Sequence, residues 1–465
     1  MNLQNKCCFI VLSASFISYF ANTYSVIIDD TMIQNVIETN INESVDLINT
    51  RLILYLIFIG LIPAFFIYKI KLKKVSLKRS ILNKVVTLLV SFLIIGIALV
   101  SFSQFYTSFF REHKPLRYHT NPTYAFYSAG KYLANVFHNT QDDFKKIGLD
   151  AKKDPDSTGR KLTIMVVGEA ARADRFSLNG YSRETNPLLK NEDIINFPNM
   201  YSCGTTTAVS VPCMFSILER KNYSDSKAKS TENVLDILSR EGVKVLWRDN
   251  NSSSKGVADR ISYEDYRTPK INTMCNDECR DEGMLIGLQD FIDQQENDDI
   301  LIVLHQMGNH GPAYYKRYPK TFEKFQPVCA TNQLEECGKD KIGNAYDNAI
   351  LYTDYFLTQT IQFLKQNDRQ FKTALIYMSD HGESLGEGGL YLHGMPYFIA
   401  PDTQKHIGAL MWFGNQSKTE INTERLKKVA SKRFSHDNLF HTLLGFMKIK
   451  TAVYNKEKDI LVEHE

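Results

Sequence analysis

Three long uncharged stretches lie in the first quarter of the chain. They cover residues 7–28, 52–68 and 85–110 and are rich in Ile, Leu, Val and Phe. A helix that crosses a membrane needs about 20 mostly apolar residues, and roughly 17 to 25 are tolerated. The pattern therefore predicts three transmembrane helices. A cleavable signal peptide is the alternative for the first stretch, which is long for one and lacks a clear small-residue cleavage site.

The loops between these helices differ in charge. The loop between the second and third stretches is basic, whereas the loop at 29–51 is mainly acidic. The positive-inside rule puts the basic loop in the cytoplasm. With three spans, the N-terminus then lies inside, and everything after about residue 110 lies outside.

Beyond residue 160, short apolar runs alternate with helix-like stretches such as 231–241 and 343–366. The runs are 162–167, 243–247, 300–305, 373–378 and 407–413. This alternation is typical of βαβ units around a largely parallel sheet. We expect a membrane domain over 1–110, a connector over 111–160 and an exported α/β domain over 161–465. The aromatic connector either lies along the membrane interface or is a plain linker.

Composition narrows the function classes and locates the charge. The 465 residues are 43% hydrophobic and 23% charged, which excludes a disordered protein. A formal net charge of +3 argues against a nucleic-acid binder. Residues 1–110 hold 9 Lys and Arg against 5 Asp and Glu, so the basic excess belongs to the membrane part. The mean hydropathy of −0.26 averages a polar exported part with three apolar spans.

Six of the eight cysteines follow the membrane part, in three close sequence pairs. They are Cys203 and Cys213, Cys275 and Cys279, and Cys329 and Cys337. An even number without a CxxC motif favours local disulfides in an oxidising compartment, and proximity favours these three pairings. Six reduced, buried cysteines are the alternative.

Carboxylates and imidazoles follow three of the predicted strands. They are Glu169 after the first, His305 and His310 after the third, and Asp380, His381, Glu383 and His393 after the fourth. The carboxyl ends of parallel strands share one edge, where ligand sites lie. Glu169, Asp380 and His381 form a ligand set suited to Zn²⁺, which His310 and His393 complete or extend to a second metal or a phosphate. Any one of these residues alone would more often belong to an ordinary turn, but their convergence indicates a site.

Two further segments carry polar groups suited to phosphate. The hydroxyl-rich loop 202–213 holds Thr205, Thr206 and Thr207 and runs into an apolar stretch, 214–218, predicted to be a helix. A hydroxyl at a helix N-terminus faces free N–H groups, which favours a nucleophile, although threonine is also a common N-cap. Composition does not choose among the three threonines. The segment 247–256 is either a phosphate-binding loop or a solvated one.

Several motifs together resemble one family. They are VVGEAARADRFSLNGYSRETNPLL (166–189), NMYSCGTTTAVSVPCMFS (199–216), LWRDNNSSSKGV (246–257), LHQMGNHGPAYYKRYP (304–319) and SDHGESLGEGGLYLHGMP (379–396). In these motifs the chain resembles the lipid A phosphoethanolamine transferases of Gram-negative inner membranes, including the mobile colistin-resistance type. The resemblance implies an alkaline-phosphatase-like α/β/α sandwich in the periplasm, one or two Zn²⁺ ions and three local disulfides.

The resemblance also implies roles for individual residues. Metal ligands are Glu169, Thr207, Asp380 and His381, and Thr207 is the nucleophile. His310 and His393 match histidines near the phosphate or a second zinc. The positions that match the binding of phosphoethanolamine are Asn251, Lys255 and Glu383, and we group His305 with them. The polar residues that match a lipid cavity are Asn35, Thr39 and Glu43.

The expected reaction moves phosphoethanolamine from phosphatidylethanolamine to a phosphate of lipid A, through an intermediate on Thr207. It gives resistance to polymyxins such as colistin. We expect a monomer that binds membrane lipids and no nucleic acid. The alternatives are another acceptor, such as lipopolysaccharide core or a surface glycan, a hydrolase of the same superfamily, and an inactive membrane sensor. The family has five membrane helices, so this chain is expected to lack the first two.

Overall fold

The computed structural model describes residues 3–38, 47–72, 76–102, 114–139, 144–296 and 298–462. The described residues form two compact units. The first draws on Met1–Asn22, Ile27–Asp29 and Thr50–Ser128, and the second on Thr23–Val26, Asp30–Asn49 and Ala129–Glu465. The short helix α2 (Asp30–Glu38) thus belongs to the second unit. The division into membrane domain, connector and exported domain at residues 110 and 160 stays a prediction.

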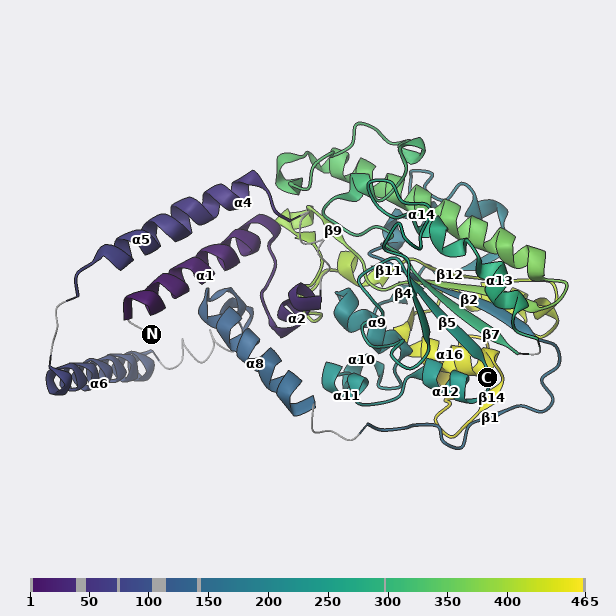
Figure 1. The fold of residues 1–465 in the computed structure, drawn as a ribbon, viewed down its shortest axis with the longest axis horizontal. Coiled ribbons are helices and arrows are strands. Elements are labelled where there is room, and N and C mark those ends of the chain that lie inside the picture. The colour runs from purple at the N-terminus through teal and green to yellow at the C-terminus, as the bar shows by residue number, and fades with distance from the viewer. Residues whose placement is uncertain are drawn as a thin grey trace. The chain divides into compact units, whose positions relative to one another are not determined.

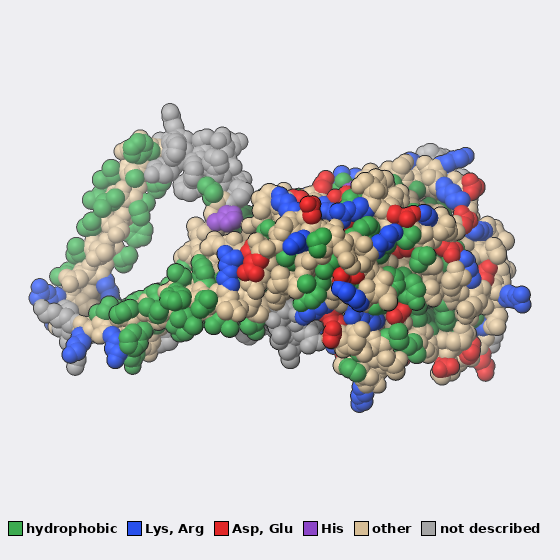
Figure 2. Space-filling view, turned by 90° about the horizontal axis from the view of Figure 1, so that it is seen from above, with side chains coloured by type: hydrophobic (Ala, Val, Ile, Leu, Met, Phe, Trp, Pro, Cys, Tyr) green, Lys and Arg blue, Asp and Glu red, His purple; other side chains and the backbone are tan. Residues whose placement is uncertain are grey.

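The first unit contains three helical segments that are long and apolar enough to cross a membrane. They are Leu3–Tyr24, Thr50–Lys69 and Lys78–Ser101. Figure 2 shows hydrophobic side chains along these helices, while basic and acidic side chains are mixed over the second unit. The apolar side chains of α6 (Leu77–Ser101) are exposed over its length, as expected where lipid is the solvent.

The first two of these segments pack together along closely fitting small residues. Helix α1 (Leu3–Tyr24) runs antiparallel to the segment formed by α4 (Thr50–Tyr55), the π-helical turn η1 (Leu56–Leu61) and α5 (Ile62–Lys69) (Figure 1). A Cβ on Gly60 would lie 2.6 Å from the Ser15 hydroxyl oxygen, so glycine is needed there. Pro63 lacks an N–H group, which accounts for the change of helical hydrogen bonding at η1.

The remaining helical elements before the second unit's sheet are short or amphipathic. The 3₁₀ helix η2 covers Lys114–His119, and α8 covers Thr123–Asn139. Asn121 donates a hydrogen bond to the carbonyl of Ala14 at 2.9 Å, which ties the start of α8 to α1 within the first unit.

The second unit is built on a seven-stranded sheet. In spatial order its strands are β3 (Ile194–Asn196), β12 (Ala409–Phe413), β8 (Lys372–Ser379), β2 (Lys161–Gly168), β7 (Ile300–His305), β5 (Lys244–Asp249) and β6 (Ser262–Asp265). The five strands from β8 to β6 are parallel, and β12 is antiparallel to both of its neighbours. Each predicted apolar run overlaps one of these strands, although residues 243, 407 and 408 lie outside them, and the α/β fold is confirmed.

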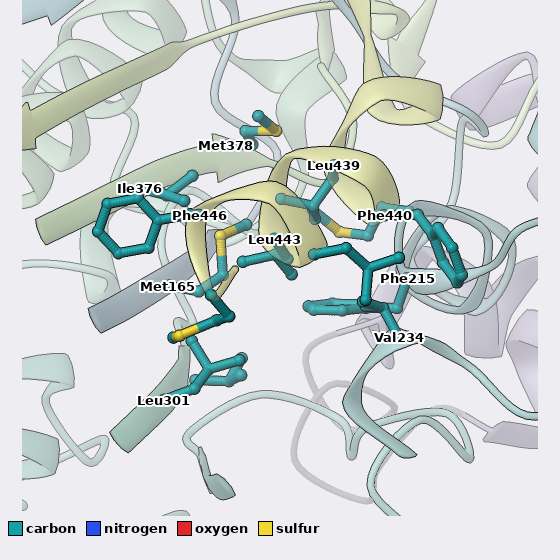
Figure 3. Close-up of a cluster of buried hydrophobic side chains, with 14 of the residues drawn as sticks. Met165, Phe215, Val234, Leu301, Ile376, Met378, Leu439, Phe440, Leu443 and Phe446 are labelled. Carbon is teal, nitrogen blue, oxygen red and sulfur yellow. The ribbon is translucent and has the colours of Figure 1, made fainter. Parts of the chain in front are cut away.

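Helices cover both faces of this sheet because its strands are apolar on both sides. Along β2, Met165 and Val167 join one buried cluster, while Ile164 and Val166 join the other. The first cluster packs against α9 (Thr207–Phe215), α12 (Val234–Arg240) and α16 (Leu439–Phe446), as Figure 3 shows for α16. The second packs against α13 (Leu288–Asp293) and α14 (Lys339–Asn367). The result is a three-layered sandwich.

The helix predicted from the apolar stretch 214–218 is shifted in the structure. Helix α9 begins at Thr207 and ends at Phe215, with Ser216 at its C-cap in an extended conformation. The hydroxyl-rich loop therefore supplies most of the helix, because the side chains from Ala208 to Phe215 are largely buried and pack as a helix face.

Small sheets and short helices surround this sandwich. A three-stranded sheet joins β4 (Met200–Tyr201) to β11 (His406–Ile407) and β13 (Phe434–Ser435). Two-stranded pairs are formed by β9 (Ser384–Leu385) with β10 (Tyr391–Leu392), and by β1 (Lys152–Lys153) with β14 (Ile449–Lys450). The short helices are α10 (Glu219–Asn222), α11 (Asp225–Lys229) and α15 (Thr423–Val429).

The three cysteine pairs are disulfide-bonded as predicted. The bridges are Cys203–Cys213, Cys275–Cys279 and Cys329–Cys337. The first spans the loop and helix that hold Thr207. Because their sulfur atoms are bonded to each other, Cys203 and Cys213 are not available as metal ligands, although Asp437 lies near them.

We expect Leu443→Ala to destabilise the second unit by about 2–5 kcal/mol, because it leaves a cavity in the core of Figure 3. Leu443 is fully buried, whereas Leu149 is 71% exposed, so Leu149→Ala should change stability by no more than about 0.5 kcal/mol. Urea unfolding of the detergent-purified protein, followed by tryptophan fluorescence, reports on this unit, since Trp247 and Trp412 are the only tryptophans. Equal midpoints for the two variants would contradict the assignment of this core.

Candidate active site

Two buried carboxylates lie side by side where adjacent strands end. Glu169 follows β2 and Asp380 follows β8, and the last residues of these strands, Gly168 and Ser379, are paired in register. His381 comes next in the chain, and its Nε2 lies 3.2 Å from Glu169 Oε1 and 3.4 Å from Asp380 Oδ2. All three side chains are fully buried. The structure thus brings together the predicted carboxylate and histidine ligands.

Thr207 meets this cluster from the N-terminus of α9. Its hydroxyl donates a hydrogen bond to Glu169 Oε2 at 3.1 Å and lies 3.4 Å from His381 Nε2. The N-cap residue is Thr206, whose side chain makes no capping hydrogen bond. The Thr205 hydroxyl has a partner outside the cluster, because it donates a hydrogen bond to the carbonyl of Met395 at 2.7 Å. Of the three threonines, Thr207 is the one whose hydroxyl donates a hydrogen bond to a member of the carboxylate cluster, Glu169.

The cluster fits a divalent metal ion. Glu169, Asp380 and His381 each offer one ligand atom, and these three atoms lie within 4.8 Å of one another. Glu169 Oε1 and Asp380 Oδ2 are buried and make no hydrogen bond to any residue that the structure describes. His381 Nδ1 donates to the Gly382 carbonyl at 2.8 Å, which directs Nε2 toward the carboxylates. Two unsatisfied carboxylate oxygens and one imidazole nitrogen, close to the Thr207 hydroxyl, are a donor set that suits Zn²⁺.

The two buried carboxylates of the cluster also favour a positive charge beside them. Burial alone would raise the pKa of Glu169, but the three neighbouring histidines, led by His381, lower it below the usual range. Burial and the adjacent Glu169 carboxylate raise the pKa of Asp380 to about 6. Burial would lower the pKa of His381, yet the charges of Asp380 and Glu169 raise it to about 10. A metal ion would displace this imidazole proton and take over its charge.

Two further histidines lie beside His381. The ring of His393 is 4.3 Å from that of His381, and the ring of His310 is 5.7 Å from that of His393, measured between centroids. His393 Nδ1 lies 3.2 Å from Glu383 Oε2. Burial lowers the pKa of His310 to about 3, so its imidazole is neutral at pH 7. The predicted second group of histidines therefore adjoins the cluster.

The other predicted binding residues divide into two groups. Asn251 contacts the cluster, because its side-chain amide donates to Glu169 Oε2 at 2.8 Å and to the Gln306 carbonyl at 2.7 Å. Lys255 donates instead to the nearby Ser252 carbonyl at 3.0 Å. His305 is buried one strand away, where its Nδ1 lies 3.0 Å from Asp249 Oδ2.

One of the three predicted lipid-cavity residues, Asn35, belongs to the described part of the chain. Asn35 lies in α2 and is partly buried. Thr39 and Glu43 lie outside the described residues.

His436 is a buried residue that the sequence analysis missed. Its Nδ1 accepts a hydrogen bond from the Cys203 backbone N–H at 3.1 Å, and its Nε2 donates to the Ser379 carbonyl at 2.9 Å. Burial lowers its pKa to about 4, so the ring is neutral and one tautomer satisfies both partners. His436 thereby connects the loop before Thr207 to the strand end before Asp380. Its partners are backbone groups distant in sequence, so no local pattern signals this role.

Asp281 is a second missed residue. Its carboxylate accepts hydrogen bonds from the Met307 and Gly308 backbone N–H groups at 2.8 and 3.1 Å, and from the Asn250 side chain at 2.8 Å. Gly308 has a φ of +50°, and a Cβ there would lie 3.0 Å from the Glu169 carbonyl oxygen. Asp281 therefore holds the loop after β7 against both Glu169 and the loop after β5.

This sheet, with a carboxylate–histidine cluster at its carboxyl edge, defines a sulfatase-type domain, and residues 161–449 match the Sulfatase family. Residues 3–137 match a second family, described as phosphoethanolamine transferase EptA/EptB. The chain belongs to the phosphoethanolamine transferase family.

Known proteins are similar to this chain over nearly its whole length. It is 42% identical to phosphoethanolamine transferase EptA of Escherichia coli K12, across 99% of this chain and 85% of that protein. It is 43% identical to phosphatidylethanolamine transferase Mcr-1 of Escherichia coli, across 97% and 84%. The integral membrane lipooligosaccharide phosphoethanolamine transferase A (EptA) of Neisseria meningitidis has a similar structure, with a TM-score of 0.93, 36% identity and coverage of 98% and 86%.

We expect Asp380→Asn to lose most of the metal bound by the purified protein, because an amide replaces a charged ligand. Elemental analysis by mass spectrometry measures the metal content per chain. Asp402→Asn, at an exposed carboxylate, is the matched control and should keep the metal content of the unsubstituted protein. Equal metal content in both variants would exclude Asp380 as a ligand.

Substitutions at His436 should separate its two hydrogen bonds. Asn places an acceptor near the position of Nδ1, and Gln places a donor near the position of Nε2, whereas Leu supplies neither. Each buried backbone group left without a partner costs about 1–3 kcal/mol. His436→Leu should therefore destabilise the unit more than His436→Asn or His436→Gln in tryptophan-monitored unfolding. If all three variants were equally unstable, packing rather than hydrogen bonding would be the contribution of His436.

Proposed function

We propose that this protein transfers phosphoethanolamine from phosphatidylethanolamine to a phosphate of lipid A, with Thr207 as the nucleophile. The observation that carries the proposal is the hydrogen bond from the Thr207 hydroxyl to Glu169, inside a buried cluster that fits a metal ion. Two relatives of this chain, EptA and Mcr-1, are a phosphoethanolamine transferase and a phosphatidylethanolamine transferase by name, which supports the proposal.

Thr207 is placed to attack a phosphate diester. Its hydroxyl proton points at Glu169 Oε2, and its oxygen lies at the first residue of α9, where free backbone N–H groups favour bound phosphate. Attack forms a bond between Thr207 Oγ1 and phosphorus and breaks the bond from phosphorus to the diacylglycerol oxygen. Diacylglycerol takes up a proton and leaves. A phosphate oxygen of lipid A then attacks the same phosphorus, the bond from phosphorus to Thr207 Oγ1 breaks, and Thr207 Oγ1 takes up a proton to become a hydroxyl again.

We assign Glu169, Asp380, His381 and Thr207 as the residues that hold Zn²⁺, with His310 and His393 beside the phosphate or a second ion. When bound, the ion supplies Lewis acidity, which lowers the pKa of the hydroxyl and offsets phosphate charge. Asn251 orients the Glu169 carboxylate. We place Lys255 and His305 among the groups around the phosphate.

Glu383 is suited to the other end of the transferred group. Its Oε1 is buried and makes no hydrogen bond within the described part of the chain, while its Oε2 faces His393. A buried carboxylate oxygen without a donor favours a cation. We assign Glu383 Oε1 as the group that binds the ammonium of ethanolamine.

We place the first unit in the bacterial inner membrane and the catalytic unit in the periplasm. Three apolar helices, a basic loop between the second and third, and three disulfides support this orientation. An added primary amine reduces the negative charge of lipid A, which weakens the binding of cationic peptides such as polymyxin. The proposed activity therefore gives polymyxin resistance.

We expect Thr207→Ala to abolish covalent labelling of the protein by phosphatidylethanolamine carrying a labelled headgroup, because no hydroxyl remains at this position. Thr207→Ser keeps a hydroxyl and should keep measurable labelling. Mass spectrometry of lipid A from cells that express each variant measures the complete transfer. Labelling or modified lipid A at unsubstituted levels in Thr207→Ala would overturn the covalent route, and unmodified lipid A with active protein would point to another acceptor.

A further inference from the structure

Three cations gather on two tyrosine rings in the second unit. The Arg220 guanidinium lies 3.7 Å from the Tyr397 ring centroid, and the Lys405 ammonium lies 5.3 Å from the same centroid. The Arg433 guanidinium lies 3.9 Å from the Tyr201 ring centroid. The charges of Arg220 and Arg433 both act on the Tyr397 hydroxyl, so the five side chains form one group. We call it the basic–aromatic cluster.

The two arginines of this cluster differ from most arginines of the unit. Eight others form ion pairs with carboxylates: Arg172, Arg175, Arg183, Arg240, Arg248, Arg260, Arg267 and Arg317. Neither Arg220 nor Arg433 forms one with any described carboxylate. Asp437 is close to Arg220, but its Oδ1 accepts the backbone N–H of Arg220 at 2.7 Å.

A guanidinium that lies over an aromatic ring has a restricted position, so its planar set of N–H donors is partly fixed before a ligand binds. These donors match the oxygens of a phosphate, which arginine binds through two parallel hydrogen bonds. Arg220 is also partly removed from water, and this burial lowers its pKa by more than the nearby Asp437 carboxylate raises it. Lys405 pairs with the Asp402 carboxylate at 3.7 Å, whereas the two arginines have no ion pair with a described carboxylate. Two such arginines beside this lysine favour an anionic ligand.

The cluster is joined to both sides of the candidate active site. The Tyr397 hydroxyl donates to the Ser202 carbonyl at 2.9 Å, five residues before Thr207. The Ser202 N–H donates to the Lys405 carbonyl at 2.8 Å. Tyr397 also follows His393 by four residues, and between them the Gly394 N–H donates to the Thr205 carbonyl at 2.9 Å. A ligand on the cluster would therefore lie beside the loop that presents the nucleophile.

The small sheet explains why these residues meet. Tyr201 in β4 pairs with His406 in β11 on one side and with Ser435 in β13 on the other. Lys405 directly precedes β11, and Arg433 directly precedes β13. Lys405 therefore lies beside Ser202 at the end of β4, and Arg433 lies beside Asn199 at its beginning, on the other side of the strand.

We propose that the basic–aromatic cluster is a binding subsite for a second phosphate of the acceptor lipid, distinct from the phosphate that reacts. This inference rests on the proposed function and narrows its substrate. The donor, phosphatidylethanolamine, has a single phosphate, and that phosphate reacts at Thr207. An anion on the cluster during transfer therefore belongs to the acceptor. The preferred acceptor carries at least two phosphates, as lipid A does at the two ends of its disaccharide.

The test measures binding without chemistry. In full-length Thr207→Ala protein in detergent, we expect bisphosphorylated lipid A to bind about tenfold more tightly than its monophosphorylated form, from charge-assisted hydrogen bonds to the second phosphate. Adding Arg220→Gln and Arg433→Gln should reduce this ratio to near one. Adding Arg369→Gln instead, at an exposed arginine outside the cluster, should keep the ratio.

Conservative variants protect the test against simple loss of folding. Arg220→Lys with Arg433→Lys keeps both charges but not the planar donors, so we expect an intermediate ratio. Tryptophan-monitored unfolding verifies that each variant is folded. A ratio near one before the arginine substitutions, or an unchanged ratio after them in folded protein, would overturn the subsite. Absence of transfer by the unsubstituted protein, with the ratio intact, would instead overturn the proposed reaction alone.

Discussion

Two carboxylates buried side by side are the constraint on which the rest of the site depends. The register between β2 and β8 puts Glu169 next to Asp380, where neither reaches bulk water. Two like charges in a buried site are unfavourable unless a cation accompanies them. The need for a cation accounts for His381 and the other histidines beside the carboxylates. It also accounts for the oxygen of each carboxylate that makes no hydrogen bond within the described part of the chain. The sheet thus creates a concentration of buried negative charge that a metal ion would neutralise, and α9 presents the Thr207 hydroxyl beside it.

The loops around these carboxylates are held by a small number of buried hydrogen bonds. His436 links the segment before Thr207 to the end of β8, and Asp281 links the loops after β5 and β7. Asn251 continues this network to Glu169 itself. His436 and Asp281 bind backbone groups of other elements, and Asn251 binds both the Glu169 side chain and the Gln306 carbonyl. These bonds fix loops without using regular secondary structure. The Thr207 hydroxyl and the candidate metal ligands are therefore positioned in part by His436 and Asp281, which are not among the predicted site residues.

The sequence made the sheet and the ligand cluster predictable, because apolar runs mark buried parallel strands and the strand ends converge. The residue pattern could not single out Thr207 among the three threonines, because that choice depends on the residue at which α9 begins. The family resemblance alone singled out Thr207. His436 and Asp281 escaped prediction because their partners are backbone groups in distant segments. Arg433 escaped it because its position follows from the pairing of two-residue strands, which leave no hydrophobic pattern. Arg220 escaped it because the ring that it contacts, Tyr397, is distant in the sequence.

The disulfides bear on how the exported unit is made. Their cysteines are separated by ten, four and eight residues. Such short loops restrict the unfolded chain little, so each bridge stabilises its own loop more than the whole fold. Each pair can close between nearest neighbours soon after its segment crosses the membrane, before the sheet is assembled. Oxidation in order of emergence therefore yields the native pairing, and the chain has little need of disulfide reshuffling during biogenesis.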